Sequence, residues 1–147
     1  MNESLNIIIT GASKGIGLEM TKKFLSLGHQ VYAVSRSIES LESLAVENHK
    51  LNVIQLDITE DLSVLSERLE GENVDHLINN AGYLVNKSIT RLSDKDIRLQ
   101  YEVNAIAPLR LVRELFPYFK QGASICNISS MGGVQGSAKF PGLSAYS

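Results

Sequence analysis

Short apolar runs alternate with amphipathic stretches along the chain of 147 residues. The apolar runs are aliphatic and β-branched, as expected of strands that helices cover on both faces. The stretches between them carry apolar residues at the three- and four-residue spacing typical of helices. This alternation predicts successive βαβ units, and therefore an α/β fold with a doubly wound parallel sheet. The predicted strands are Leu5–Thr10, Val31–Ser35, Val53–Leu56, His76–Asn79 and Ser124–Ile128, and the predicted helices are Ile16–Leu27, Ile38–Asn48, Glu60–Leu69 and Asp94–Phe119.

The order of the predicted strands follows from the handedness of their connections. Right-handed crossovers in a doubly wound sheet favour the strand order 3-2-1-4-5. A ligand of such a sheet binds beyond the carboxyl ends of the strands, where the strand order reverses. The residues directly after the first, fourth and fifth strands are therefore the candidates for function. Helix boundaries are predicted by N-caps at Ser37, Thr59 and Ser93, by stop residues at Gly28 and Gly71, and by a kink at Pro108.

Composition and charge exclude several classes of protein. Hydrophobic residues make up 44% and charged residues 20% of the chain, and no stretch approaches the roughly 18 apolar residues of a membrane span. The 14 basic and 16 acidic residues are interspersed, with a net charge of −2, which argues against a nucleic-acid partner. The lone Cys126 and the three scattered histidines lack zinc-ligand spacing, so we expect no metal.

The start of the chain predicts a cytoplasmic protein, because its first residues lack the basic segment and apolar core of a signal peptide. With three prolines, no low-complexity tract and no repeat, residues 1–147 are expected to form a single domain. A single cysteine cannot form an intramolecular disulfide, which fits a reducing compartment. Because it lies on an apolar strand, Cys126 is expected to be a buried small hydrophobe rather than a nucleophile.

A glycine-rich turn follows the first predicted strand. Residues Thr10–Gly17 read TGASKGIG and lead directly into the first predicted helix. A tight turn with few Cβ atoms lets backbone N–H groups and a helix N-terminus approach a pyrophosphate. Many strand-to-helix loops carry two glycines for geometry alone, but here both flanking elements are evident, so we predict nucleotide binding. The candidate residues are Gly11, Ser13, Lys14, Gly15, Ile16 and Gly17.

The end of the second predicted strand bears on the choice of dinucleotide. It has no carboxylate that could accept hydrogen bonds from a ribose 2′-OH. Arg36 can instead pair with a 2′-phosphate, and Lys14 in the glycine-rich turn can reach the same group. Taken separately, either cation is equally well explained as a solvated surface charge. Taken together, they favour NADP over NAD as the cofactor.

Five features in chain order resemble those of the short-chain dehydrogenase/reductase family, of the type with short subunits. They are the Thr10–Gly17 turn, the Asn79-Asn80-Ala81-Gly82 segment, Asn104, the Ile128-Ser129-Ser130 run and Tyr146. The resemblance covers the whole chain. It implies a Rossmann-type fold and the reversible NAD(P)-dependent reduction of a small-molecule carbonyl to an alcohol, and it argues against a Rossmann methyltransferase.

The resemblance also implies contacts with the cofactor after the third and fourth strands. Asn80, Ala81 and Gly82 resemble the segment that lies along the cofactor. Asp57, followed by Ile58, resembles the acidic residue that faces the adenine amino group. A loop residue that helps to cap the next helix is the alternative interpretation of Asp57.

Three further residues resemble the catalytic set of the family. Asn104 resembles the helix asparagine that holds a water in the proton relay, although a satisfied polar group in the core is the alternative. Ser130 resembles the serine whose hydroxyl bonds the substrate carbonyl oxygen, and Tyr146 resembles the proton donor to that oxygen. The stretch 131–144 is longer than the usual loop of the family, so Ser129 is the alternative to Ser130.

The family also has a lysine four positions after the tyrosine, which lowers the pKa of the phenol from its ordinary value of about 10. The sequence ends at Ser147, before that position. We therefore expect negligible catalysis from these residues alone, with a non-catalytic nucleotide-binding module as the alternative function. A homo-oligomer is expected, because the outer edge of the fifth strand is left unpaired and apolar helix surface is left uncovered. In relatives the long helix also forms a dimer face, which is the alternative role of its apolar residues. The residues that either pack on the sheet or form that face are Val112, Leu115, Phe116 and Phe119.

Overall fold

The computed structural model describes residues 3–135, and its centre is a parallel sheet with the strand order β3-β2-β1-β4-β5. This order confirms the predicted doubly wound α/β fold. The strands are β1 (Asn6–Thr10), β2 (Gln30–Ser35), β3 (Leu51–Gln55), β4 (Val74–Asn79) and β5 (Phe119–Asn127). The helices are α1 (Gly15–Ser26), α2 (Glu39–Glu47), α3 (Ser63–Leu69), α4 (Asp94–Tyr101), α5 (Ala107–Leu115) and α6 (Gly132–Gln135).

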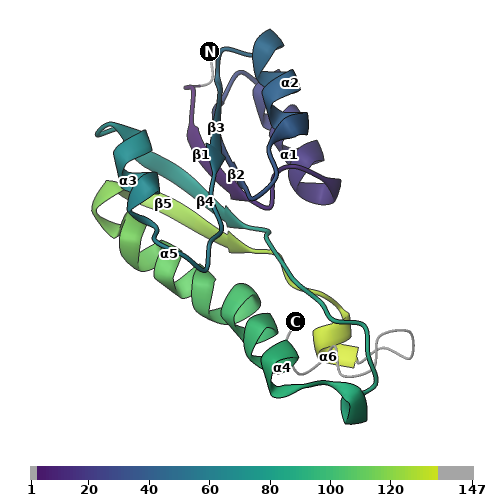
Figure 1. Cartoon of the computed structure of the whole chain (residues 1–147). Coiled ribbons are helices and arrows are strands. Elements are labelled where there is room, and N and C mark those ends of the chain that lie inside the picture. The colour runs from purple at the N-terminus through teal and green to yellow at the C-terminus, as the bar shows by residue number, and fades with distance from the viewer. Residues whose placement is uncertain (1–2, 136–147) are drawn as a thin grey trace.

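Helices cover both faces of the sheet, α1 and α2 on one side and α3 and α5 on the other (Figure 1). The central strand β1 shows why, because its successive side chains point to opposite faces and its three middle residues, Ile7–Ile9, are apolar. Ile7 and Ile9 are fully buried in the cluster that includes Leu41 of α2. Ile8 lies in the opposite cluster, with Leu111 of α5. Burial on both sides of β1 anchors the turn that follows it.

Two of the predicted helix N-caps are wrong. The helix α2 begins after Ile38 rather than after Ser37, and α3 begins after Leu62 rather than after Thr59. Neither helix has a side-chain cap. Asp57 accepts hydrogen bonds from both the amide and the hydroxyl of Thr59, at 3.0 and 2.8 Å. This local turn engages Thr59 before α3 begins, so the helix starts later than its polar signal predicts.

The other predicted boundary signals agree with the structure. Ser93 is the N-cap of α4 and forms a capping box with Asp96. Gly28 directly follows the C-cap of α1 and has φ +84°. Gly71 follows the C-cap of α3 and has φ +86°. Both glycines adopt the left-handed conformation that ends helices at little steric cost.

Pro108 does not end the long helical segment. It lies in the first turn of α5, directly after a π-helical segment, Glu102–Ile106. In this segment the amide of Ala107 bonds to the carbonyl oxygen of Glu102, five residues earlier. Proline has no N–H to bond the carbonyl four residues before it, and that carbonyl belongs to Asn104. The irregularity predicted at Pro108 is therefore a short π-helical segment before α5, and this segment includes Asn104.

The strand β5 forms one edge of the sheet and begins at Phe119, earlier than predicted. Its carboxyl half is exposed, with 44% of Ile125 accessible to solvent. The prediction that Cys126 is buried is wrong, because this residue is exposed on the same edge strand. An apolar pattern predicts a strand but does not show whether both of its faces are covered.

Candidate functional site

The glycine-rich turn between β1 and α1 packs tightly on its inner side. Gly11 has φ +66°, and a Cβ atom there would lie 2.8 Å from the Cα atom of Ala81. A Cβ atom at Gly17 would lie 2.2 Å from the carbonyl oxygen of Gly11. Gly15 has φ +55° with no neighbouring atom within 4 Å of its Cβ position. The turn is thus pressed against the segment after β4 and is open at Gly15.

Thr10 and Asn80 hold the turn to the end of β4. The buried hydroxyl oxygen of Thr10 accepts hydrogen bonds from the amides of Asn80, at 3.1 Å, and Ala81, at 3.0 Å. The Asn80 carboxamide donates to the carbonyl oxygens of Thr10, at 3.0 Å, and Gly11, at 3.2 Å. These four bonds join the chain after β1 to the chain after β4, where the strand order reverses.

A first cleft of about 430 Å³ lies beside this turn, at the carboxyl ends of β1, β2 and β3. Lys14 and Arg36 both line it, and both side chains are exposed. Ser35 donates a hydrogen bond of 2.8 Å to the hydroxyl of Ser13, which ties the turn to the end of β2. The cleft is lined by Gly11, Ser13, Lys14, Val34–Ser37, Leu56–Ile58, Ala81–Leu84 and Val103.

Asp57 is the acidic group of this cleft. Partial burial would raise the pKa of its carboxyl, but hydrogen bonds from Thr59 and the nearby Arg36 charge lower the pKa below its ordinary value. The closest Arg36 nitrogen is 3.9 Å from a carboxylate oxygen, and 68% of the arginine side chain is exposed. Such an exposed pair contributes little stability, so the guanidinium can turn toward an anion at modest cost. The capping interpretation of Asp57 is wrong, because α3 starts after Leu62 without a side-chain cap and the other Asp57 oxygen closes the Thr59 turn.

A second cleft of about 630 Å³ lies on the other side of the segment after β4. It contains Asn104, Ser129 and Ser130. The Ser130 hydroxyl oxygen accepts a hydrogen bond of 3.1 Å from the amide of Gly132, which leaves its hydrogen directed elsewhere. The cleft is lined by Asn79–Leu84, Asn104, Ala105, Pro108, Leu109, Val112 and Asn127–Ser130.

Asn104 is bonded to the backbone of the wall that the two clefts share. Its carboxamide oxygen accepts from the Tyr83 amide at 2.8 Å, and its nitrogen donates to the Tyr83 carbonyl oxygen at 2.9 Å. Tyr83 and Leu84 line both clefts. Asn104 therefore holds in place the backbone of Tyr83, which forms part of the wall shared by both clefts.

The structure brings most of the predicted site residues to these two adjacent clefts. Asn104 and Ser130 lie in the second cleft, but Tyr146 lies outside the described residues. Gly15 and Ile16 begin α1 and line neither cleft, and Gly17 packs beneath the turn. The predicted residues that line the first cleft are Gly11, Ser13, Lys14, Arg36, Asp57, Ile58, Ala81 and Gly82.

Sequence reasoning missed two polar residues that shape the site. No role was predicted for the Thr10 hydroxyl, which is buried at the carboxyl end of β1. A hydroxyl residue at the end of an apolar strand is the sequence signal for it, because a buried hydroxyl needs a hydrogen-bond partner. Gln100 is fully buried, and its carboxamide bonds the backbone of Val85 in the loop after β4. Spacing alone could not assign Gln100, because its partner has no fixed separation along the sequence.

The sheet order, with a glycine-rich turn at the point of reversal, defines a Rossmann-type α/β protein. Residues 5–147 match the sequence model described as short chain dehydrogenase. The chain therefore belongs to the short-chain dehydrogenase/reductase family, which is a family of oxidoreductases. Within residues 3–135, no helix is both long and apolar enough to cross a membrane.

Individual relatives agree with this family. Oxidoreductase BOA17 of Botryotinia fuckeliana is 34% identical over 146 residues, covering 94% of this chain and 52% of that protein. The NADPH-dependent 1-acyldihydroxyacetone phosphate reductase of Saccharomyces cerevisiae is 31% identical over 149 residues, covering 95% of this chain and 49% of that protein. The chain thus spans about half the length of these curated relatives.

A solved structure shows the same fold. The crystal structure of a carbonyl reductase from Pseudomonas aeruginosa PAO1 in complex with NADP superposes with a TM-score of 0.90, at 30% identity. The match covers 98% of this chain and 67% of that chain.

Proposed function

We propose that the protein is an NADP(H)-dependent oxidoreductase that interconverts a small-molecule carbonyl and the corresponding alcohol. One observation carries the proposal: a cleft with two exposed cations adjoins a cleft with the asparagine and serine of the family's catalytic set. The two clefts share the wall at Tyr83 and Leu84. We also propose that the nucleotide-binding residues form a single domain, and that the protein is a cytoplasmic homo-oligomer.

The described residues fit a dinucleotide. The glycine-rich turn is open at Gly15, and α1, which starts there, presents its N-terminal N–H groups, a favourable site for a pyrophosphate. Lys14 and Arg36 are the residues for a 2′-phosphate, and Asp57 with Ile58 is the pair for the adenine. When bound, NADPH supplies the hydride that reduces the carbonyl carbon.

Three residues of the chain have roles in the proton chemistry. Ser130 donates its hydroxyl hydrogen to the carbonyl oxygen, which stabilises the negative charge that develops there. Tyr146 transfers the phenolic proton to the same oxygen on reduction and takes it back on oxidation. Asn104 supports the proton relay from the helix, while its carboxamide holds Tyr83. Ser129, which lines the same cleft, is the alternative to Ser130.

Cofactor titration tests the first half of the proposal. The protein should bind NADPH more tightly than NADH, because each charge-assisted contact to the 2′-phosphate contributes roughly 1.5–3 kcal/mol. Arg36→Asp should reverse this preference. Arg91→Asp makes the same charge change outside both clefts and should leave the preference unchanged. Equal affinity of the wild type for both cofactors would overturn the assignment of NADP.

Turnover tests the second half. NADPH oxidation by the full-length native protein is followed with a panel of ketones and aldehydes. Tyr146→Phe should abolish nearly all reduction while NADPH binding persists, because only the proton donor is removed. Ser130→Ala should slow the same step by less. A greater loss from Ser129→Ala would transfer the role to Ser129, and full activity of Tyr146→Phe would contradict the mechanism.

A further inference from the structure

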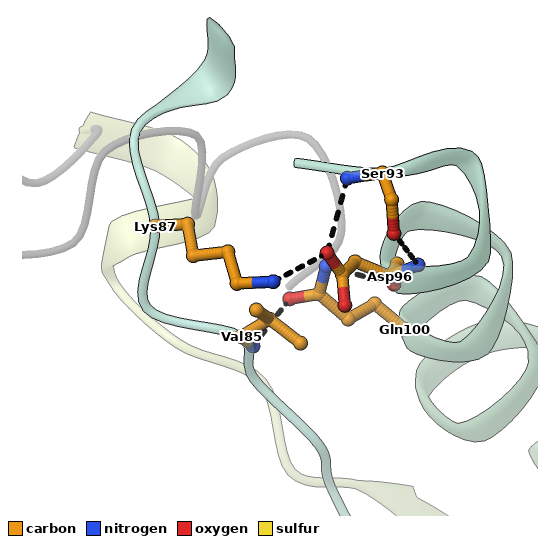
Figure 2. A network of polar contacts seen from close by, with 5 residues as sticks. All are labelled: Val85, Lys87, Ser93, Asp96 and Gln100. Carbon is orange, nitrogen blue, oxygen red and sulfur yellow. Dashed lines mark hydrogen bonds and ion pairs between the residues drawn. The ribbon is translucent and has the colours of Figure 1, made fainter. Parts of the chain in front are cut away.

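Side chains from one helical segment hold the loop after β4 at alternate residues. Asn104 bonds both the amide and the carbonyl oxygen of Tyr83, as described above. The carboxamide oxygen of Gln100 accepts a hydrogen bond of 2.8 Å from the amide of Val85. The ammonium group of Lys87 lies 2.8 Å from a carboxylate oxygen of Asp96. Figure 2 shows the last two contacts side by side.

The contacts pair the two segments in opposite directions, so that helix positions 104, 100 and 96 meet loop positions 83, 85 and 87. Between Val85 and Lys87 the loop makes a tight turn, because the Lys87 amide donates a hydrogen bond of 3.0 Å to the Val85 carbonyl oxygen. Alternate amides of an extended chain point to the same side, so the amides of Tyr83 and Val85 both face the helix. We call these three pairs the polar ladder.

Gln100 is the middle rung of the polar ladder and its most buried side chain. Its exposed fraction is 0%. Its oxygen accepts from Val85, and its nitrogen donates to the carbonyl oxygen of Asp96 at 3.1 Å. Both ends of the carboxamide are thus bonded, which fixes its orientation. A buried polar group that is satisfied in this way rigidifies its surroundings, whereas losing it would leave the Val85 amide without its acceptor.

The outer rung is joined to the start of α4. The carboxylate of Asp96 accepts a hydrogen bond of 3.0 Å from the amide of Ser93, and the Ser93 hydroxyl accepts one of 3.1 Å from the amide of Asp96. The same carboxylate oxygen that caps the helix binds Lys87 (Figure 2). The loop is therefore connected to a helix terminus that is itself locked by a capping box.

Tyr83 is the loop partner of Asn104, and Leu84 lies between that rung and the Gln100–Val85 rung. Both Tyr83 and Leu84 line both clefts. We propose that Gln100 is a positioning residue for cofactor and substrate binding, acting through the backbone of Val85 to set the shared wall of the two clefts. The inference rests on the proposed function, because it takes the first cleft to be the NADP(H) site. Gln100 itself lines neither cleft, so its effect is indirect.

The test replaces Gln100 with methionine, which keeps the length of the side chain and removes both hydrogen bonds. Amide hydrogen exchange and NADPH affinity are measured on the same protein. We expect exchange at Val85 and Tyr83 to accelerate roughly 10-fold and the NADPH dissociation constant to rise roughly 10-fold, the effect of losing one buried hydrogen bond.

A matched control separates positioning from general destabilisation. Asp75→Leu removes a buried acceptor that bonds the Asn6 amide at 2.8 Å, at the amino end of the sheet. It should lower the melting temperature without changing NADPH affinity or exchange at Tyr83. Gln100→Met with unchanged NADPH affinity, or an equal loss of affinity in Asp75→Leu, would overturn the positioning role.

The exposed end of the ladder provides a second test if Gln100→Met does not fold. The Lys87 side chain is 46% exposed, so Lys87→Met should fold normally. It should accelerate exchange at Val85 and weaken NADPH binding by less than Gln100→Met, and Lys87→Arg should restore both. No change in either measurement for Lys87→Met would contradict the ladder. A wild type that binds no NADPH contradicts the proposed function instead, and exchange at Tyr83 and Val85 then decides the ladder alone.

Discussion

The Cα atom of Gly17 lies so close to Gly11 that a Cβ atom at position 17 would be 2.2 Å from the Gly11 carbonyl oxygen. The same Cβ atom would lie 2.6 Å from the carboxamide nitrogen of Asn80. The first contact is with backbone, which cannot move aside without opening the turn. Gly11 and the start of helix α1 are therefore packed as one unit against the residues that follow β4.

Gly17→Ala should lower the free energy of unfolding by about 1–3 kcal/mol, the usual cost of overpacking, and should also weaken NADPH binding. Urea denaturation and a fluorescence titration measure the two effects. Gly28→Ala is the control, because Gly28 has φ +84°, where alanine is strained, but nothing lies within 4 Å of its Cβ position. This control should lose stability from backbone strain while NADPH affinity stays unchanged. Equal binding losses in both variants would contradict the packing argument.

Thr10→Val should destabilise the protein by about 2 kcal/mol or more, because two backbone amides lose their acceptor in a buried position. Valine keeps nearly the same shape, so the loss reports on the hydroxyl. Thr10→Ser keeps the hydroxyl and removes one methyl group, which should cost about 1 kcal/mol. Thermal or urea unfolding compares the two variants. A larger loss for serine than for valine would show that packing, rather than the two hydrogen bonds, determines the effect.

The strand order and most of the candidate site could be predicted from the sequence, because both follow from local patterns. Apolar runs and crossover handedness predict the order of the sheet, and the carboxyl ends of its strands bring Arg36 and Asp57 to one cleft. Gly11 and Gly17 could be predicted because a tight turn requires glycine, whatever the tertiary contacts. These features need no knowledge of which side chains meet.

Features that depend on long-range partners could not be predicted. A buried glutamine in a helix reads as a core polar group, and only the structure shows that Gln100 bonds Val85. The prediction that Cys126 is buried is wrong because an apolar strand pattern does not distinguish an edge strand from a central strand of a sheet. The prediction of an N-cap at Thr59 is wrong because the Asp57 carboxylate binds the amide and hydroxyl of Thr59 in a local turn before the helix. For Gln100 and Thr59 the deciding feature is a hydrogen bond that the pattern does not show, and for Cys126 it is the open face of an edge strand.

Asp96 should make the stability of the protein depend on pH in the acid range. The hydrogen bond from Lys87, together with those from Ser93, lowers the pKa of this carboxyl from 3.8 to about 2. Because the folded pKa lies below the unfolded value, the stabilising contribution is fully present above pH 3.8 and is lost as the pH falls through 2. The urea midpoints of the wild type and Asp96→Asn should therefore differ at pH 5 and converge toward pH 2.

The control for this titration is Asp94→Asn, which removes a carboxylate from the same helical turn. Other carboxyl groups with lowered pKa values, including those of Asp57 and Asp75, contribute equally to both members of each comparison. The difference between the wild type and Asp96→Asn therefore isolates one group. A difference between these two proteins that stays constant from pH 5 to pH 2 would contradict the assigned pKa.

The helix α5 has apolar residues on opposite sides, and this pattern leads to a prediction about association. Leu111 and Leu115 are fully buried against the sheet, whereas Leu109 is 73% and Phe116, which directly follows the helix, is 74% exposed. Leu109 and Phe116 are seven residues apart, which corresponds to about two helical turns and therefore to one stripe. The sequence predicted that Leu115 and Phe116 either pack on the sheet or form a dimer face. Leu115 packs in the core cluster, and Phe116 is exposed.

We expect the chain to self-associate at micromolar concentrations through this outer stripe, because large apolar side chains exposed on one side of a helix favour burial against another chain. Phe116→Lys should shift the distribution toward the monomer in sedimentation velocity and light scattering. Lysine is chosen because a cation is favourable near a helix C-terminus, so the helix itself should not be weakened. Val46→Lys is the control, since Val46 is 80% exposed on α2, at a different surface. A wild type that stays monomeric at tens of micromolar, or an equal shift in both variants, would refute a specific role for the stripe.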